Sequence, residues 1–365
     1  MNSKETKKVE AEKINNALSP SSIKTALKHL LAAREVPMIW GPPGVGKSDL
    51  VAEIGKESNR KVIDIRLALW EPTDVRGIPY FDPESKTMKW ASPSELPHGE
   101  NDNPIILFDE LVSAAPSVQV GAYQITLNRR IGEYILPQGA DMICAGNREN
   151  DRGVTYKMPM PLANRLIHLT MKTDFNDWFQ WAINNNIHND VVSFLSWSKK
   201  DLFDFDPKSS SVAFATPRSW AKASNILKNS ENAPESLLMA LIGGAVGDGV
   251  AISFMTHRKL SSKLPKAEDI LSGKLTKFKY NKDISVLYAL NINCCNELRE
   301  RVGQKDWIKQ VDNFYRFVLD NFPQEMIVMA VRLSLRNYSL PIDPEKLSTY
   351  DAFMEKVEKH LFVQD

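Results

Sequence analysis

A glycine-rich loop, Gly41-Pro-Pro-Gly-Val-Gly-Lys-Ser48, constrains this chain more than any other segment. It fits the pattern G-x-x-x-x-G-K-[ST] and stands between a short apolar run and a helical pattern. Glycines allow backbone N–H groups to surround phosphate oxygens, and the following helix directs the positive end of its dipole at them. The pattern therefore predicts a phosphate-binding strand-loop-helix unit. Its expected contact residues are Gly41, Pro42, Pro43, Gly44, Val45, Gly46, Lys47 and Ser48.

Five short β-branched runs alternate with helical patterns between about residue 19 and residue 172. Runs this short, lying between helical segments, are typical of strands in a parallel sheet that is covered on both faces. The sequence thus predicts an α/β core with a five-stranded parallel sheet. The expected strands are 36–40, 61–67, 105–108, 141–145 and 166–170.

Two segments interrupt the alternation, and each is predicted to form a β-hairpin. The first runs from Gly77 to Trp90 around a turn at 82–86, and the second spans 131–136. Projecting hairpins often contact other molecules, although ordinary surface loops would explain both segments equally well.

After residue 172 the pattern becomes helical, with apolar residues at helical spacing from Trp307 to Phe322 that indicate packing. The apolar stretch 237–254 is interrupted by four glycines and an aspartate, so we expect two buried helices there and no membrane span. The expected domains are a flexible N-terminal tail (1–18), the α/β core (19–172), a helical lid (173–263) and a helical C-terminal extension (264–365).

Polar residues stand directly after the third and fourth predicted strands. Asp109 and Glu110 follow the third strand, and Asn147 follows the fourth. The carboxyl ends of parallel strands lie beside the phosphate loop, where Asp109 can hold Mg²⁺ together with the Ser48 hydroxyl. Glu110 is then the candidate base for the attacking water, and the Asn147 amide can contact that water or the γ-phosphate. On its own, Asn147 would be an ordinary turn residue.

An arginine is the remaining part expected of such a site, because a guanidinium stabilises the charge on a transferring phosphoryl group. Arg165 precedes the fifth strand, and Arg218 stands at a predicted helix start in the predicted lid. Position in the chain does not separate Arg165 from three other arginines, which are Arg129, Arg130 and Arg148.

In this combination of motifs the chain resembles the AAA+ ATPases, and most closely the MoxR-type branch of the helix-2-insert group, which also holds the motor subunits of magnesium and cobalt chelatases. The resemblance covers about residues 20 to 260. It rests on these segments, in the family's order: Gly41 to Ser48, Phe108-Asp-Glu-Leu111, Ala145-Gly-Asn147, Ala163-Asn-Arg165 and Thr216-Pro-Arg218. Leu166 departs from the family, which usually has Phe there. The region after about Leu264 matches nothing that we can name.

The resemblance implies a role for each matched residue. Asn147 would be the sensor-1 residue, Arg165 the arginine finger acting on a neighbour's ATP, and Arg218 the sensor-2 residue contacting the chain's own nucleotide. The two hairpins would be the helix-2 insert and the pre-sensor-1 hairpin. An arginine supplied by a neighbour places the active site between subunits, and the family's usual assembly is a ring of six.

The resemblance implies a Mg²⁺- and ATP-dependent ring motor that remodels a protein client in a chaperone-like manner, with a von Willebrand A-type adaptor as a plausible partner. The absence of an N-K-x-D guanine motif favours ATP over GTP. A nucleic-acid motor or loader is an alternative, because the basic stretch from Lys274 to Lys282 contains interleaved aromatic residues. A nucleotide-gated scaffold with little turnover is a third interpretation, and the intact Asp109-Glu110 pair argues against it.

Composition narrows these alternatives. The 365-residue chain carries 46 Lys and Arg against 45 Asp and Glu, so no broad cationic surface for nucleic acid or anionic membranes is expected. Its three cysteines show no C-x-x-C spacing, so they are interpreted as core residues in a reducing compartment. The N-terminus lacks the apolar segment of a secretory signal, and a cytoplasmic location is expected.

Overall fold

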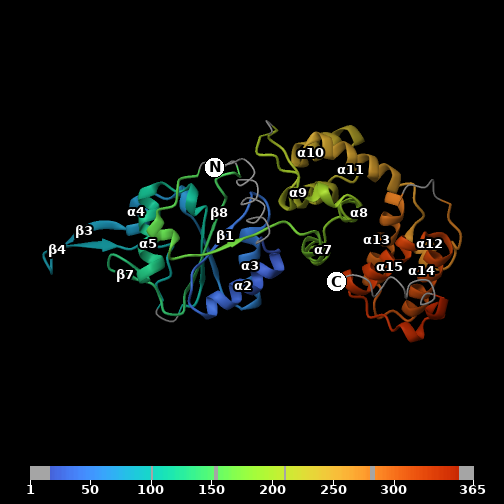
Figure 1. Cartoon of the computed structure of the whole chain (residues 1–365), viewed down its shortest axis with the longest axis horizontal. Helices are drawn as coiled ribbons and strands as arrows, with labels where there is room; N and C mark the ends of the chain where they lie inside the picture. The colour runs from blue at the N-terminus through green and yellow to red at the C-terminus, as the bar shows by residue number, and fades with distance from the viewer. Residues whose placement is uncertain (1–16, 100–101, 152–154, 209–210, 280–283, 353–365) are drawn as a thin grey trace, which may run out of the picture. The chain divides into compact units, whose positions relative to one another are not determined.

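The fold is described from a computed structural model of the chain, for residues 17–99, 102–151, 155–208, 211–279 and 284–352. The chain divides into two compact units, Met1–Asp174 and Phe175–Asp365 (Figure 1). Residues 1–16 of the expected N-terminal tail lie outside the described ranges. The further division of the second unit into a lid and an extension stays a prediction.

A five-stranded parallel sheet forms the centre of the first unit, with strand order β2-β5-β8-β1-β9. All five predicted strands are confirmed. They are β1 (Pro37–Trp40), β2 (Val62–Arg66), β5 (Ile105–Asp109), β8 (Asp141–Gly146) and β9 (Ile167–Thr170). Because β8 lies between β1 and β5, the carboxyl ends of these three strands are adjacent along one edge of the sheet.

Helices cover both faces of this sheet, which explains why its strands read as continuous apolar runs. Met38 and Phe108 share a buried cluster with Ala122 of α5 (Pro116–Asn128). Neighbouring strand residues point to the opposite face, where α3 (Lys47–Glu57) packs against β2 and β5, and α2 (Pro20–Ala32) packs against α3. Figure 1 shows α2 and α3 on one side of the strands and α5 on the other.

Both predicted hairpins are present in the first unit. The larger one joins β3 (Ile78–Asp82) to β4 (Thr87–Ala91), and Figure 1 shows it projecting from the sheet. It begins at Gly77, which has φ +92° and ends α4 (Pro72–Arg76). A Cβ atom at Gly77 would lie 2.0 Å from the Ala91 carbonyl oxygen, so only glycine fits this position.

The smaller hairpin joins two short strands, β6 (Arg130–Ile131) and β7 (Tyr134–Ile135). The Tyr134 hydroxyl donates a 2.6 Å hydrogen bond to the Pro97 carbonyl, which ties this hairpin to the segment after β4. Burial raises the pKa of Tyr134 to about 12, so the phenol stays protonated and remains a donor.

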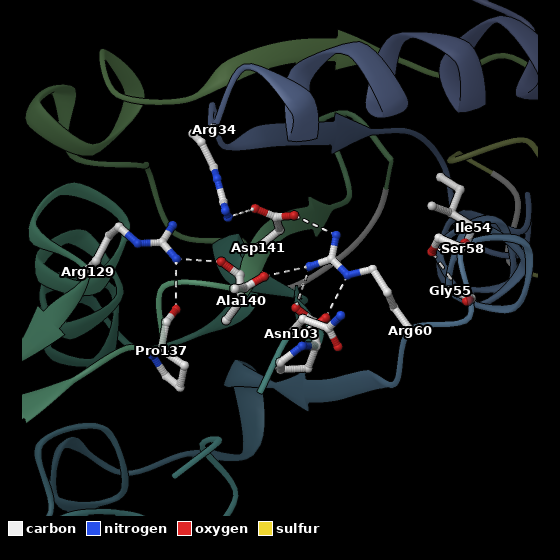
Figure 2. A network of polar contacts seen from close by, with 12 residues as sticks. Arg34, Ile54, Gly55, Ser58, Arg60, Asn103, Arg129, Pro137, Ala140 and Asp141 are labelled. Atoms are coloured by element: carbon white, nitrogen blue, oxygen red, sulfur yellow. Dashed lines mark hydrogen bonds and ion pairs between the residues drawn. The ribbon is translucent and has the colours of Figure 1, made fainter. Parts of the chain in front are cut away.

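A network of arginines holds the amino ends of β5 and β8 together (Figure 2). Asp141, the first residue of β8, accepts hydrogen bonds from Arg34 Nη1 at 2.8 Å and from Arg60 Nη1 at 2.6 Å. Arg60 also donates to the Asn103 carbonyl just before β5. Arg129 donates to the carbonyl of Ala140, next to Asp141. The buried Asp141 carboxylate is therefore fully paired, as a charge at that depth requires.

The second unit is helical, and its helices share one buried apolar cluster. The predicted stripe from Trp307 to Phe322 is confirmed as core, and the predicted pair of helices in 237–254 is confirmed as α10 and α11. Among the described residues its α-helices are α7 (Phe175–Asn184), α8 (Asn189–Trp197), α9 (Pro217–Asn229), α10 (Glu235–Val246), α11 (Asp248–Ser261), α12 (Ala267–Leu271), α13 (Ile284–Glu300), α14 (Trp307–Asn321) and α15 (Gln324–Val331).

All three cysteines are buried, which confirms their interpretation as core residues. Burial raises the pKa of the Cys144 thiol to about 12, so this thiol stays protonated and is a poor nucleophile. Across the described ranges, none of the helices has the combination of length and apolar character that crossing a bilayer requires.

Candidate nucleotide-binding site

The glycine-rich loop joins β1 to α3 and forms a backbone cradle. Gly44 and Gly46 have φ of +77° and +94°, the left-handed region that glycine adopts without strain. Gly46 is the N-cap of α3, so the N–H groups of the first helical turn face the loop. A loop of this kind followed by a helix N-terminus binds phosphate groups through backbone donors and the helix dipole. The predicted strand-loop-helix unit is confirmed as a structure.

Lys47 lies inside this cradle and is only 8% exposed. Its ammonium donates hydrogen bonds to the carbonyls of Gly41 at 2.7 Å and Pro42 at 3.0 Å, and to Asn147 Oδ1 at 2.9 Å. A buried ammonium needs such partners, and phosphate oxygens would satisfy the same donors with a full opposite charge. The structure thus joins the loop lysine to the residue after β8, a contact that the sequence analysis did not predict.

The side chains of Ser48 and Asp109 meet at the carboxyl ends of the strands. The Ser48 hydroxyl donates a 2.7 Å hydrogen bond to Asp109 Oδ2, and the Glu110 backbone N–H donates to Asp109 Oδ1 at 2.8 Å. A hydroxyl and a carboxylate are the hard oxygen donors that Mg²⁺ prefers, alone or through its water shell. These two residues, next to the phosphate cradle, fit the magnesium ion that a bound nucleoside triphosphate would bring.

Glu110 differs from Asp109 in its surroundings. The chain turns sharply after β5, and Glu110 has φ +56°, a left-handed conformation that is uncommon for a residue with a side chain. The next residues, Leu111 and Val112, are buried, whereas Glu110 is exposed. The turn thus places a carboxylate at the open side of the site while its neighbours anchor the backbone. This placement suits a base that acts on water.

Asp64 is a charged neighbour of this site that the sequence analysis missed. It lies on β2, opposite Leu107 of β5 and on the same face as Asp109. Desolvation and the Asp109 charge raise the pKa of Asp64, and Arg66 partly opposes them. The available sequence signal was a charged aspartate inside the apolar run 61–67.

The candidate arginines have different surroundings. Arg129 donates to the carbonyls of Pro137 and Ala140. Arg148 binds Asp151 through two hydrogen bonds, of 2.9 and 3.2 Å. Both guanidinium groups therefore hold local structure. Arg130 is exposed on the small hairpin, where it donates to the Gly132 carbonyl at 2.9 Å.

Arg165 lies away from its own phosphate loop. It precedes β9, whose first residue Ile167 pairs with the amino end of β1 through a 3.0 Å hydrogen bond to the Val36 carbonyl. Arg165 thus lies at the amino ends of the strands, whereas the cradle lies at their carboxyl ends. Its guanidinium lies 4.0 Å from the centre of the Tyr123 ring and donates to the Pro161 carbonyl at 3.0 Å.

Arg218 belongs to the second unit, at the start of α9 as predicted. Thr216 and Ser219 cap this helix reciprocally, with Ser219 N–H to Thr216 Oγ1 at 3.0 Å and Thr216 N–H to Ser219 Oγ at 2.7 Å. Arg218 itself is exposed. Its contact with a nucleotide in the first unit stays a prediction.

Comparisons with known proteins find similar structures only. No model of a known protein family matches the chain, and no curated protein matches it. One similar structure, from Cytophaga hutchinsonii, is described as a candidate ATPase; it is 12% identical, with 96% of this chain and 94% of that chain covered and a TM-score of 0.36. Another is RuvB, the Holliday junction branch migration motor of Thermotoga maritima, at 14% identity, 68% and 77% coverage and a TM-score of 0.36. These values are too low to support an argument about function.

Proposed function

We propose that this chain is a Mg²⁺-dependent ATPase of the AAA+ type. One observation carries the proposal: the loop lysine, the Ser48-Asp109 pair, Glu110 and Asn147 converge at the adjacent carboxyl ends of β1, β5 and β8. Ligands of open α/β sheets bind at this edge, where the strand order reverses. The four groups provide the parts that phosphoryl transfer to water requires.

Each residue has a distinct task in the proposed reaction. Lys47 exchanges its carbonyl partners for the β- and γ-phosphate oxygens, and Ser48 and Asp109 hold the metal ion. The metal ion, when bound, neutralises charge on the phosphates. Glu110 orients the attacking water and accepts its proton, while Asn147 fixes the water or a γ-phosphate oxygen by hydrogen bonding.

A direct test measures ATP hydrolysis by the purified chain with Mg²⁺ and after chelation by EDTA. We expect turnover that Lys47→Ala abolishes together with nucleotide affinity, since this substitution removes a buried, charge-assisted donor. Lys56→Ala is the matched control, because Lys56 is an exposed lysine near the end of the same helix. Failure of the wild-type chain to bind ATP at millimolar concentration would falsify the proposal.

The proposed assembly is a homo-oligomeric ring, with six subunits as in the family that the chain resembles. Arg165 supports it, because this arginine lies at the sheet edge opposite its own cradle and is better placed to serve a neighbour. We expect ATP to promote assembly in sedimentation velocity. We also expect Arg165→Ala to lower turnover by about 1,000-fold or more, with Arg148→Ala as the comparison. Normal turnover in Arg165→Ala would exclude the assignment.

The proposed work is remodelling of a protein client, as in the MoxR-type branch, with a von Willebrand A-type adaptor. The large hairpin supports a contact role, because Ile78, Phe81 and Met88 are 61–67% exposed on it. Exposed apolar side chains gathered on one projecting element mark an interaction surface. A pull-down with Glu110→Gln in ATP, with and without the substitution Phe81→Ser, tests this role. Equal capture of the same client by both forms would argue against the hairpin.

A nucleic-acid motor has weaker support. In the basic stretch, Phe278 packs its ring against Phe317 at 6.3 Å between centroids, and its backbone N–H binds Asn321. A ring used for packing is not a free stacking platform. Residues 280–282 of this stretch lie outside the described ranges. Stimulation of the ATPase by single- or double-stranded DNA, lost steeply with added salt, would favour this alternative.

A further inference from the structure

Two hydrogen bonds to one imidazole connect the end of β1 with the segment that carries Arg165. The indole N–H of Trp40, the last residue before the phosphate loop, donates to His168 Nδ1 at 2.9 Å. His168 Nε2 lies 2.8 Å from the carbonyl oxygen of Ala163, which ends α6 (Met160–Ala163). The Trp40 and His168 rings are also stacked, with centroids 5.9 Å apart.

The chemistry of the partners assigns the hydrogens. An indole N–H only donates, so Nδ1 of His168 must accept, and a carbonyl only accepts, so Nε2 must carry the hydrogen. His168 therefore acts as acceptor and donor at once, in a single neutral tautomer. The side chains of Asn and Gln also offer a donor and an acceptor, but their carboxamide groups differ from imidazole in length and geometry. An alanine side chain offers neither a donor nor an acceptor.

Both ends of this connection lie at functionally important positions. On one side, the residue after Trp40 is Gly41, whose carbonyl accepts a hydrogen bond from the Lys47 ammonium. On the other side, Asn164 and Arg165 follow Ala163 directly. The Trp40 backbone is held as well, since Met171 N–H donates to its carbonyl at 2.7 Å. Hydrogen bonds thus connect the start of the loop with the segment that carries Arg165.

We propose that His168 is a positioning residue that couples a subunit's own phosphate loop to the arginine which that subunit lends to its neighbour. This inference rests on the proposed function, and in particular on Arg165 acting in trans. When ATP draws Lys47 away from the Gly41 carbonyl, the end of β1 adjusts, and His168 passes the change to the last turn of α6. The orientation of Arg165 then depends on whether its own subunit holds nucleotide.

The experiment mixes two kinds of subunit. The effect of the arginine that one subunit lends to its neighbour is then measured separately from ATP hydrolysis in the lending subunit itself. Wild-type chain is mixed with an excess of chain that carries Glu110→Gln, which binds ATP but does not hydrolyse it, so all measured turnover comes from wild-type sites. The Glu110→Gln chain additionally carries His168→Ala, Trp40→Phe, Arg165→Ala or, as matched control, His98→Ala. His98 is also exposed and also bonds one backbone carbonyl, that of Pro93 at 2.9 Å.

We expect the Arg165→Ala partner to lower wild-type turnover most, and the His168→Ala and Trp40→Phe partners to lower it by about 10-fold, in kcat rather than KM. Trp40→Phe keeps an aromatic ring at this position but removes the indole N–H donor. ATP affinity of each partner chain, measured by fluorescent-nucleotide titration, should stay within about threefold of the Glu110→Gln parent.

Unchanged wild-type turnover beside the His168→Ala and Trp40→Phe partners would overturn the coupling, while leaving the ATPase and the trans arginine intact. Unchanged turnover beside the Arg165→Ala partner would overturn the trans assignment, and the coupling with it. Loss of turnover beside His98→Ala as large as beside His168→Ala would also count against His168, because any exposed histidine would then have the same effect.

Discussion

The Lys47 ammonium donates a 2.9 Å hydrogen bond to the Asn147 side-chain oxygen, at the carboxyl ends of two adjacent strands. The lysine is a residue of the phosphate loop, and the asparagine follows β8, which lies directly beside β1. Asn147 Oδ1 thus accepts from the same ammonium as the carbonyls of Gly41 and Pro42. If Lys47 binds the γ-phosphate as proposed, the Asn147 amide oxygen and the phosphate compete for the same ammonium.

Substitution of Asn147 should therefore separate turnover from affinity. We expect Asn147→Ala to lower kcat about 100-fold, because one fixed polar group at the reacting phosphate is lost. The nucleotide Kd should stay within about threefold or become tighter, since a competing acceptor for Lys47 is removed. Single-turnover kinetics and nucleotide titration measure the two quantities. Asn150→Ala, in the exposed part of the same loop, is the control; a large loss of affinity in Asn147→Ala would contradict this account.

Substitution of Glu110 should leave binding intact. We expect Glu110→Gln to lower kcat at least about 100-fold, because the amide cannot accept the proton of the attacking water. Nucleotide affinity should not change, since the exposed Glu110 side chain is not part of the cradle. Glu133→Gln on the small hairpin is the control, and turnover above a tenth of the wild-type value in Glu110→Gln would rule out its role as base.

Substitutions in the arginine network at the amino ends of the strands should lower the free energy of unfolding by unequal amounts. The Asp141 and Arg60 side chains are 8% and 17% exposed, whereas Arg34 is 55% exposed. Asp141→Asn should lower the free energy of unfolding by about 3 kcal/mol, because it leaves Arg60 buried without its counter-charge. Arg34→Ala should cost less than about 1 kcal/mol, as for exposed ion pairs. Urea unfolding followed by circular dichroism measures both, and equal losses would show that burial does not set the difference.

Asp312 of α14 should make the second unit sensitive to acid. Burial raises the pKa of Asp312, but hydrogen bonds from Ser348 and Thr349 outweigh that effect, so the pKa lies below its ordinary value of 3.8. The carboxylate therefore stabilises the fold above that value, and the contribution disappears as the pH falls through the lowered pKa. Asp312→Asn should be less stable than wild type at pH 7 by roughly 2 kcal/mol.

The quantity to measure is the difference in the free energy of unfolding between wild type and Asp312→Asn. It should shrink progressively as the pH falls below 3.8, the ordinary value, in urea titrations monitored by circular dichroism. Asp320→Asn, near the end of the same helix, is the comparison. A difference between wild type and Asp312→Asn that is the same at neutral and acid pH would contradict the assignment of the hydrogen bonds.

Much of the fold could be predicted because it is encoded locally. The five strands are short β-branched runs, the hairpins contain their own turns, and the phosphate loop carries glycines where the left-handed conformation is needed. The candidate site residues could be predicted for a related reason. Asp109 and Asn147 each follow a strand, and parallel strands end at one edge.

Partners that depend on distant segments could not be predicted. Nothing near Asp64 in the chain indicates that it lies beside Asp109, because β2 and β5 are separated by a helix and a hairpin. Position in the chain did not separate the four candidate arginines, and it gave no sign of contacts such as those of Arg148 with Asp151 or of Arg165 with the Tyr123 ring. Similarly, nothing local pairs Trp40 with His168, which lies 128 residues later.

The sequence by itself determined the element types and the side chains available in the glycine-rich loop, because backbone conformation and side-chain class are properties of a few neighbouring residues. The tertiary structure alone decided the strand order, and the strand order decides which side chains meet. Placing β8 beside β1 brings Asn147 to Lys47, and the parallel pairing of β9 with β1 leaves Arg165 at the amino ends of the strands. Hydrogen bonds extend only about 3 Å, so such contacts exist only once the sheet has assembled.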